Sequence, residues 1–65
     1  MSNYYFKLRG DDPIPTSFSE DKYSKDDLHR AYVGQWVKTG DEEYDEAQII
    51  GVMTSAEAKA YFEEV

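Results

Sequence analysis

The chain of 65 residues contains no cysteine, and this absence constrains its fold more than any other feature. A chain of about 60 residues buries only about 60% of the surface that its unfolded form exposes, so chains of this size often depend on disulfides or a metal. Without cysteine there is no disulfide and no thiolate metal site, and a single His29 excludes a His-rich metal site. Apolar side chains must therefore supply the core, and the ten aromatic rings are the largest of them. We expect one compact domain over residues 1–65.

The charge of the chain excludes two classes of partner. Fourteen Asp and Glu against seven Lys and Arg give a formal net charge of −7. Nucleic-acid backbones and anionic membranes are bound by clustered cations, so we expect neither direct nucleic-acid binding nor membrane binding. The longest apolar run is far too short to cross a bilayer, and the N-terminus lacks the layout of a signal peptide. These features predict a cytoplasmic protein.

Residues 4–9 alternate between apolar and polar side chains, a pattern typical of a half-buried strand. The apolar side carries Tyr4, Phe6 and Leu8, and the other side carries Lys7 and Arg9. The pattern therefore predicts a strand with a cationic outer face.

The next segment, residues 10–23, contains two prolines and many short polar residues. Because proline restricts the residue before it, we expect a surface loop held to the core by Phe18. Ser24 then fits the N-cap of a helix, with Asp26 and Asp27 at the positive end of the helix dipole.

The sequence leaves two interpretations open for residues 31–38. Helical spacing of apolar residues favours one helix over 24–38, with Gly40 as its C-terminal glycine. The β-propensity of Tyr, Val and Trp favours a strand over 31–38 instead, and Gly34 would weaken a helix by about 1 kcal/mol.

The C-terminal third predicts a strand followed by a helix. Residues 47–53 are apolar on both faces, as in a well-buried strand. Thr54 and Glu57 have the spacing of a capping box. The helical stripe that follows consists of Ala58, Tyr61, Phe62 and Val65. We expect Tyr61 and Phe62 to pack against the 47–53 strand.

Together these elements predict an α+β (small mixed α/β) fold. The order is β-α-β-α in a single domain, with a two- or three-stranded sheet packed by one or two helices. The three-stranded version uses residues 31–38 as its middle strand. A sheet this small has open edges, so an edge would need a third strand or a partner.

The sequence contains no catalytic or metal-binding constellation, so we expect no enzyme, no metal and no cofactor. His29 falls on the charged side of the predicted helix, and every acid stands in a polar run, where a raised pKa is not expected. The acids from Asp41 onward imitate a calcium loop, but Glu46 and Val52 occupy the positions that need Gly and Glu.

The acidic segment 41–46 is the one feature that suggests a function, because five of its six residues are acidic. It is either a solvated loop or an electrostatic docking surface with Tyr44 as an aromatic contact. The candidate partner-binding residues are Asp41, Glu42, Glu43, Tyr44, Asp45 and Glu46, with Asp26 and Asp27 extending the patch.

In size, charge and composition the chain resembles the small inhibitors that bacteriophages make against host enzymes or defence systems. That resemblance implies an acidic, protein-binding inhibitor or modulator. It would act as a nucleic-acid mimic on a basic surface of a larger protein. The alternative is a structural module that forms a homodimer through a sheet edge or through an aromatic patch of Tyr4, Phe6 and Trp36.

Overall fold

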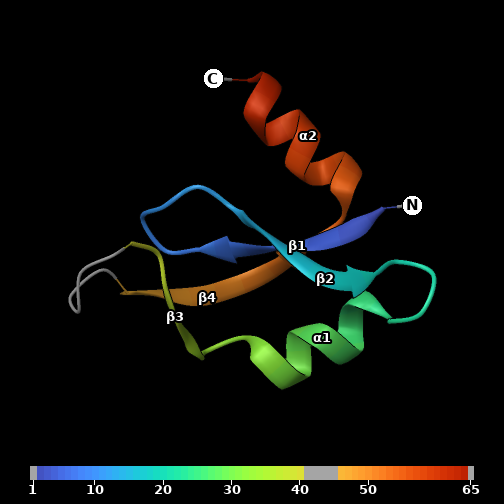
Figure 1. The fold of residues 1–65 in the computed structure, drawn as a ribbon, viewed down its shortest axis with the longest axis horizontal. Helices are drawn as coiled ribbons and strands as arrows, with labels where there is room; N and C mark the ends of the chain where they lie inside the picture. The colour runs from blue at the N-terminus through green and yellow to red at the C-terminus, as the bar shows by residue number, and fades with distance from the viewer. Residues whose placement is uncertain (1, 41–45, 65) are drawn as a thin grey trace.

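Four antiparallel strands form one curled sheet, and a helix lies on each side of it (Figure 1). The computed structural model describes residues 2–40 and 46–64. The elements are β1 (Asn3–Leu8), β2 (Ile14–Ser19), α1 (Lys25–Tyr32), β3 (Trp36–Lys38), β4 (Glu46–Met53) and α2 (Ser55–Glu63). The strand order is β2-β1-β4-β3, so β1 and β4 form the centre of the sheet and β2 and β3 form its edges. Within the described residues, neither helix is long and apolar enough to span a bilayer.

The predicted β-α-β-α order with a two- or three-stranded sheet is wrong, because the sheet has four strands. The strand missed by the prediction is β2, which lies within the segment 10–23 that was expected to be a loop. Ile14 and Phe18 pack against the core, as expected for Phe18. Pro15 fits because β2 is an edge strand, where a missing N–H need not break the ladder. Pairing with β1 therefore outweighs the local preference of this segment for a loop.

The segment 31–38 contains both structures that its sequence suggested. Helix α1 ends at Tyr32, so the helix predicted over 24–38 is too long. Val33 (φ −62°, ψ 129°) and Gly34 (φ +99°) then form a type II turn, closed by a hydrogen bond of 3.0 Å to the Tyr32 carbonyl. The turn requires a left-handed residue at the Gly34 position, so this glycine, and not Gly40, ends the helix.

The inner face of the sheet and α1 together enclose the core. Tyr4, Phe6 and Leu8 are buried on this face, which confirms the predicted alternation in β1. Leu28 is the buried residue of α1. Ring centroids 5.1 to 6.2 Å apart link an aromatic cluster of Phe6, Phe18, Tyr23 and Tyr32. Aromatic packing thus joins β1, β2 and α1.

A β-bulge explains why β4 looks apolar on both faces. The register between β1 and β4 shifts between Lys7 and Leu8, which makes Ile50 an extra residue in β4. Because the bulge resets the alternation, Ile49 and Val52 are both buried although they are three residues apart, while Ile50 is 38% exposed. The prediction that this strand is buried on both faces is therefore wrong.

Helix α2 begins as predicted, but its aromatic side chains do not pack as predicted. The Thr54 hydroxyl accepts a hydrogen bond from the Glu57 N–H, and the Glu57 carboxylate accepts one from the Thr54 N–H, which confirms the capping box. Ala58 is buried, Tyr61 is half-buried and Phe62 is 46% exposed, so the expected burial of Phe62 is wrong. The reason is visible in Figure 1, where α2 runs away from the strands towards its C-terminal end.

Candidate interaction surface

The outer face of the sheet, which points away from α1, is only partly covered by α2. Among the described residues, the helix packs against β1 and β4 and has no comparable packing against β3. On the β3 side, the register places Arg9 beside Gln48 and Gln48 beside Trp36, and the Arg9 N–H donates to the Gln48 carbonyl at 3.0 Å. Since neighbouring strands lie about 4.8 Å apart, these three residues form a row across the sheet, about 10 Å from end to end.

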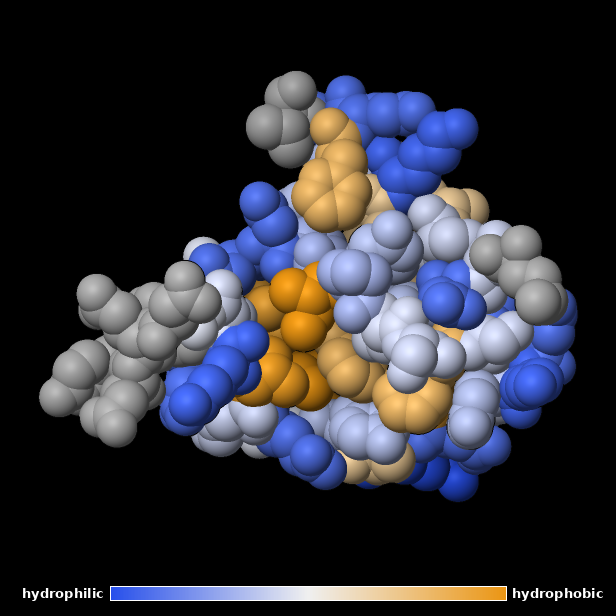
Figure 2. Space-filling view, viewed as in Figure 1, coloured by the Kyte–Doolittle hydropathy of each residue, from blue (hydrophilic) through white to orange (hydrophobic). Residues whose placement is uncertain are grey.

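The β3 side contains the most exposed large apolar side chain among the described residues, Trp36, which is 62% exposed. Single exposed apolar residues are ordinary on protein surfaces, but Trp36 lies on β3, Ile50 lies on the neighbouring β4, and Arg9 directly follows β1. Trp and Arg are also the residue types that most often dominate the energy of protein interfaces. Figure 2 shows a small apolar patch over the middle of β4 among hydrophilic side chains. We name Arg9, Trp36, Lys38, Gln48 and Ile50 the open face.

Hydrogen bonds hold the open face in a fixed shape. The Gly34 N–H donates to the Ile49 carbonyl and the Ile49 N–H donates to the Gln35 carbonyl, both at 2.8 Å. The Gln48 side chain adds a bond of 3.1 Å to the Gly34 carbonyl. A shallow hollow of about 300 Å³ results, lined by Arg9, Val33, Gly34, Gln48, Ile49 and Ile50. A surface arranged before binding loses less conformational entropy when a partner docks.

The predicted docking residues are not gathered into one patch among the described residues. Asp41, Glu42, Glu43, Tyr44 and Asp45 lie outside the residues that the structure describes. Glu46 is exposed at the start of β4, and Asp26 and Asp27 are exposed in the first turn of α1. Their neighbour Lys25 bonds to α2, which follows the far end of β4. Glu46 lies at the other end of β4, seven residue steps or about 24 Å of extended strand away.

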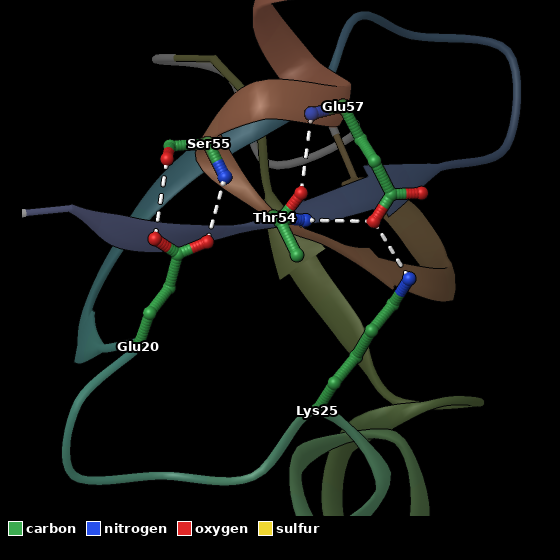
Figure 3. Close-up of polar contacts among 5 residues, drawn as sticks. All are labelled: Glu20, Lys25, Thr54, Ser55 and Glu57. Carbon is green, nitrogen blue, oxygen red and sulfur yellow. Dashed lines mark hydrogen bonds and ion pairs between the residues drawn. The ribbon is translucent and has the colours of Figure 1, made fainter.

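A polar cluster attaches α2 to the rest of the chain (Figure 3). The Glu20 carboxylate accepts hydrogen bonds from the Ser55 N–H at 3.0 Å and the Ser55 hydroxyl at 3.2 Å. The Lys25 ammonium lies 2.7 Å from the Glu57 carboxylate. This bond, followed by the bond from the Thr54 N–H, holds the pKa of Glu57 below its usual value. The carboxylates are occupied by groups of the chain itself, so the cluster fixes the position of α2.

A second hollow, of about 350 Å³, lies between the β1–β2 connection and α2. Its lining includes Lys7, Asp11, Asp12 and Tyr61, and it contains no Ser, Thr, Cys or His. The Tyr61 hydroxyl donates to Asp12 at 3.2 Å, and this bond raises the pKa of Tyr61. Across the part of the chain that the structure describes, no three His, Asp or Glu side chains gather as metal ligands.

Comparison with known proteins finds no matching protein-family model, no matching curated protein and no matching solved structure. The function of the open face must therefore be inferred from its own residues.

Sequence reasoning identified part of the open face. Arg9 was predicted to lie on the outer side of the 4–9 strand, and it is exposed. Trp36 was grouped with Tyr4 and Phe6 as an aromatic patch, and that patch is wrong because both of the other rings are buried in the core. The alternation of Trp, Val and Lys over β3 was the signal for an outward Trp36. The exposure of Ile50 had no such signal, because it results from the bulge.

Proposed function

We propose that this chain is a small protein-binding inhibitor or modulator that occupies a surface of a larger protein. The observation that carries the proposal is the exposure of Trp36 in one row with Gln48 and Arg9 on a sheet face that α2 leaves open. A partner that covers Trp36 removes a large aromatic surface from water. Arg9 supplies charged donors at the rim, which can fix the orientation of the partner.

The charge of the chain supports a partner with a basic surface. The net charge is −7, and five of the six residues 41–46 are acidic. Opposite charge steers the two proteins together and speeds association at low salt. In its most specific form, the module mimics nucleic acid and blocks a host or defence enzyme. It acts in the cytoplasm, which is the host cytoplasm if the chain is viral, with no cofactor and no direct contact to nucleic acid.

The test of the open face begins with affinity capture of the partner by the full chain, followed by measurement of Kd for the purified pair. We expect Trp36→Ala to weaken binding at least about 30-fold, as for an interface hot spot. The matched control is Phe62→Ala. This variant also loses an exposed ring, but from α2 and not from the open face, so it should bind like the wild type. Unchanged affinity in a folded Trp36→Ala variant would remove the open face from the interface.

A second variant tests the acidic segment. It replaces Asp41, Glu42, Glu43, Asp45 and Glu46 by Asn or Gln. We expect slower association and weaker binding, and we expect wild-type binding to weaken as salt rises. If only the chain itself is captured and sedimentation shows a homodimer, the alternative of a self-associating module replaces this proposal.

A further inference from the structure

We propose that the partner adds an extended strand to the free edge of β3, with an apolar residue facing the core side and cations at its ends. This inference rests on the proposed function, because it specifies how the same partner engages the region around Trp36. Strand addition uses main-chain hydrogen bonds for affinity and alternate side chains for specificity.

The two edge strands, β2 and β3, differ in whether they can pair with a further strand. Pro15 lies within β2 and Pro13 directly precedes that strand. Proline has no N–H to donate to a further strand, so proline on an edge strand often prevents such pairing. β3 has no proline and consists of Trp36, Val37 and Lys38. Among the described residues no further strand pairs with β3, so its edge is the one that can accept another strand.

The hydrogen-bond pattern shows which backbone groups of β3 point towards the free edge and not towards β4. The Ile49 N–H donates to the Gln35 carbonyl, and Val37 lies opposite Ala47 in the same register. In an antiparallel pair, residues that bond to the neighbouring strand alternate with residues that do not. The N–H and C=O groups of Trp36 and Lys38 consequently point away from β4, towards the free edge.

The side chain between these two residues sets the chemistry of the incoming strand on the core side. Val37 is half-buried and packs against the core. A residue paired beside it on a new strand would lie about 5 Å away on the same face. An apolar side chain there extends the core, whereas a charged side chain would lose water without gaining a partner.

Charge favours a cationic segment over a second copy of this chain. Two copies would bring together two molecules of formal charge −7. Lysines flanking the paired residues of the new strand would be attracted to this charge.

The probe for this inference is the end-blocked heptapeptide Lys-Lys-Thr-Val-Thr-Lys-Lys, added to the isotopically labelled full chain. Its valine would lie beside Val37, and its threonines would lie opposite Trp36 and Lys38 with their N–H groups towards β3. We expect hydrogen exchange at the Trp36 and Lys38 amides to slow about tenfold or more at saturation. Docking through side chains alone would leave these exchange rates unchanged and would overturn the inference.

Matched peptides separate strand addition from attraction of charge. N-methylation of both threonines removes the N–H groups that face β3, and we expect it to weaken binding about tenfold or more. N-methylation of the valine alters only the far edge of the peptide, so its Kd should stay within about threefold. Replacement of the four lysines by glutamate should abolish binding. Equal affinity of the two methylated peptides would overturn the inference.

The inference and the proposed function can fail separately. If the unmodified peptide does not bind at millimolar concentration while Trp36→Ala still weakens partner binding, strand addition is wrong and the open face remains an interface. If exchange at Trp36 and Lys38 slows with protein concentration alone, a second copy occupies the edge, which also overturns the inference.

Discussion

The two helices flank the same sheet, but different kinds of contact hold them in place. α1 buries Leu28 and places Tyr32 in the aromatic cluster. α2 fully buries only Ala58 among its described residues, and hydrogen bonds through Glu20, Lys25 and the Tyr61 hydroxyl add to its attachment. Burial of large rings removes far more apolar surface from water than burial of a methyl group. We therefore expect α1 to unfold with the core and α2 to loosen first.

The largest expected effect comes from two phenylalanines in different settings. Phe6 is 7% exposed and contacts two other rings, whereas Phe62 is 46% exposed on α2. Phe6→Ala should cost about 3–5 kcal/mol. That loss would leave a domain of about 5 kcal/mol total stability largely unfolded. Phe62→Ala should cost less than about 1 kcal/mol. Urea titration followed by circular dichroism measures both, and equal losses would contradict the contrast between the two sides of the sheet.

A smaller effect is expected from the acceptor at the start of α2. Glu20→Ala removes two hydrogen bonds to Ser55 and a negative charge at a helix N-terminus. The change should destabilise α2 by about 1–2 kcal/mol. Hydrogen exchange should accelerate in α2 while the amides of β1 stay protected. Glu63→Ala, at the exposed far end of the same helix, is the control and should change little. Equal loss of protection in β1 would show that α2 and the core unfold as one unit.

Acid should loosen α2 through Glu57. Its pKa lies below the ordinary value of 4.5, chiefly because the carboxylate is bonded to Lys25. Its stabilising contribution is therefore complete above that ordinary value and is lost as the pH falls through the lowered pKa. The substitution Lys25→Met should raise the pKa of Glu57, and a carboxyl titration followed by NMR measures this change. An unchanged pKa in that variant would show that the contact with Lys25 is not maintained in solution.

The smallest effect is expected at the opposite end of α2. The hydrogen bond to Asp12 raises the pKa of Tyr61 above 10.0, so it favours the neutral phenol. Its contribution is present below the ordinary pKa and is lost as the pH rises through the raised pKa. We expect Tyr61→Phe to leave thermal unfolding nearly unchanged, because the contact is exposed. Absorbance titration should show a late-titrating tyrosine in the wild type that disappears in Tyr61→Phe and shifts earlier in Asp12→Asn.

Only some residues of the open face could be placed from the sequence. Arg9 could be placed on the outer side of the 4–9 strand by alternation alone, whereas Lys38 could be placed in this way only if residues 31–38 form a strand. Their neighbours across the sheet could not, since a cross-strand row depends on register between segments far apart in the chain. The exposure of Ile50 and the left-handed turn at Gly34 depend on two irregularities in the pairing around β4.

Sequence by itself determined the features that depend on a few neighbouring residues. Ser24 and Thr54 cap the two helices as their side chains predict, and the alternation in residues 4–9 selects the buried face of β1. Each of these signals acts within one turn or one strand. Contacts with a distant segment could change the outcome only at a cost in free energy, through a lost cap or a buried polar face.

Tertiary structure decided the number of strands, the end of α1 and the shape of the open face. β2 forms from a proline-containing segment because β1 offers it a partner, and α1 stops at Tyr32 because the next residues pair with β4. Phe62 has a helical spacing suited to burial, yet it is exposed because α2 diverges from the sheet. Hydrogen bonding and burial between distant segments exceed local propensities of about 1 kcal/mol or less per residue, so the pairing partner decides the outcome.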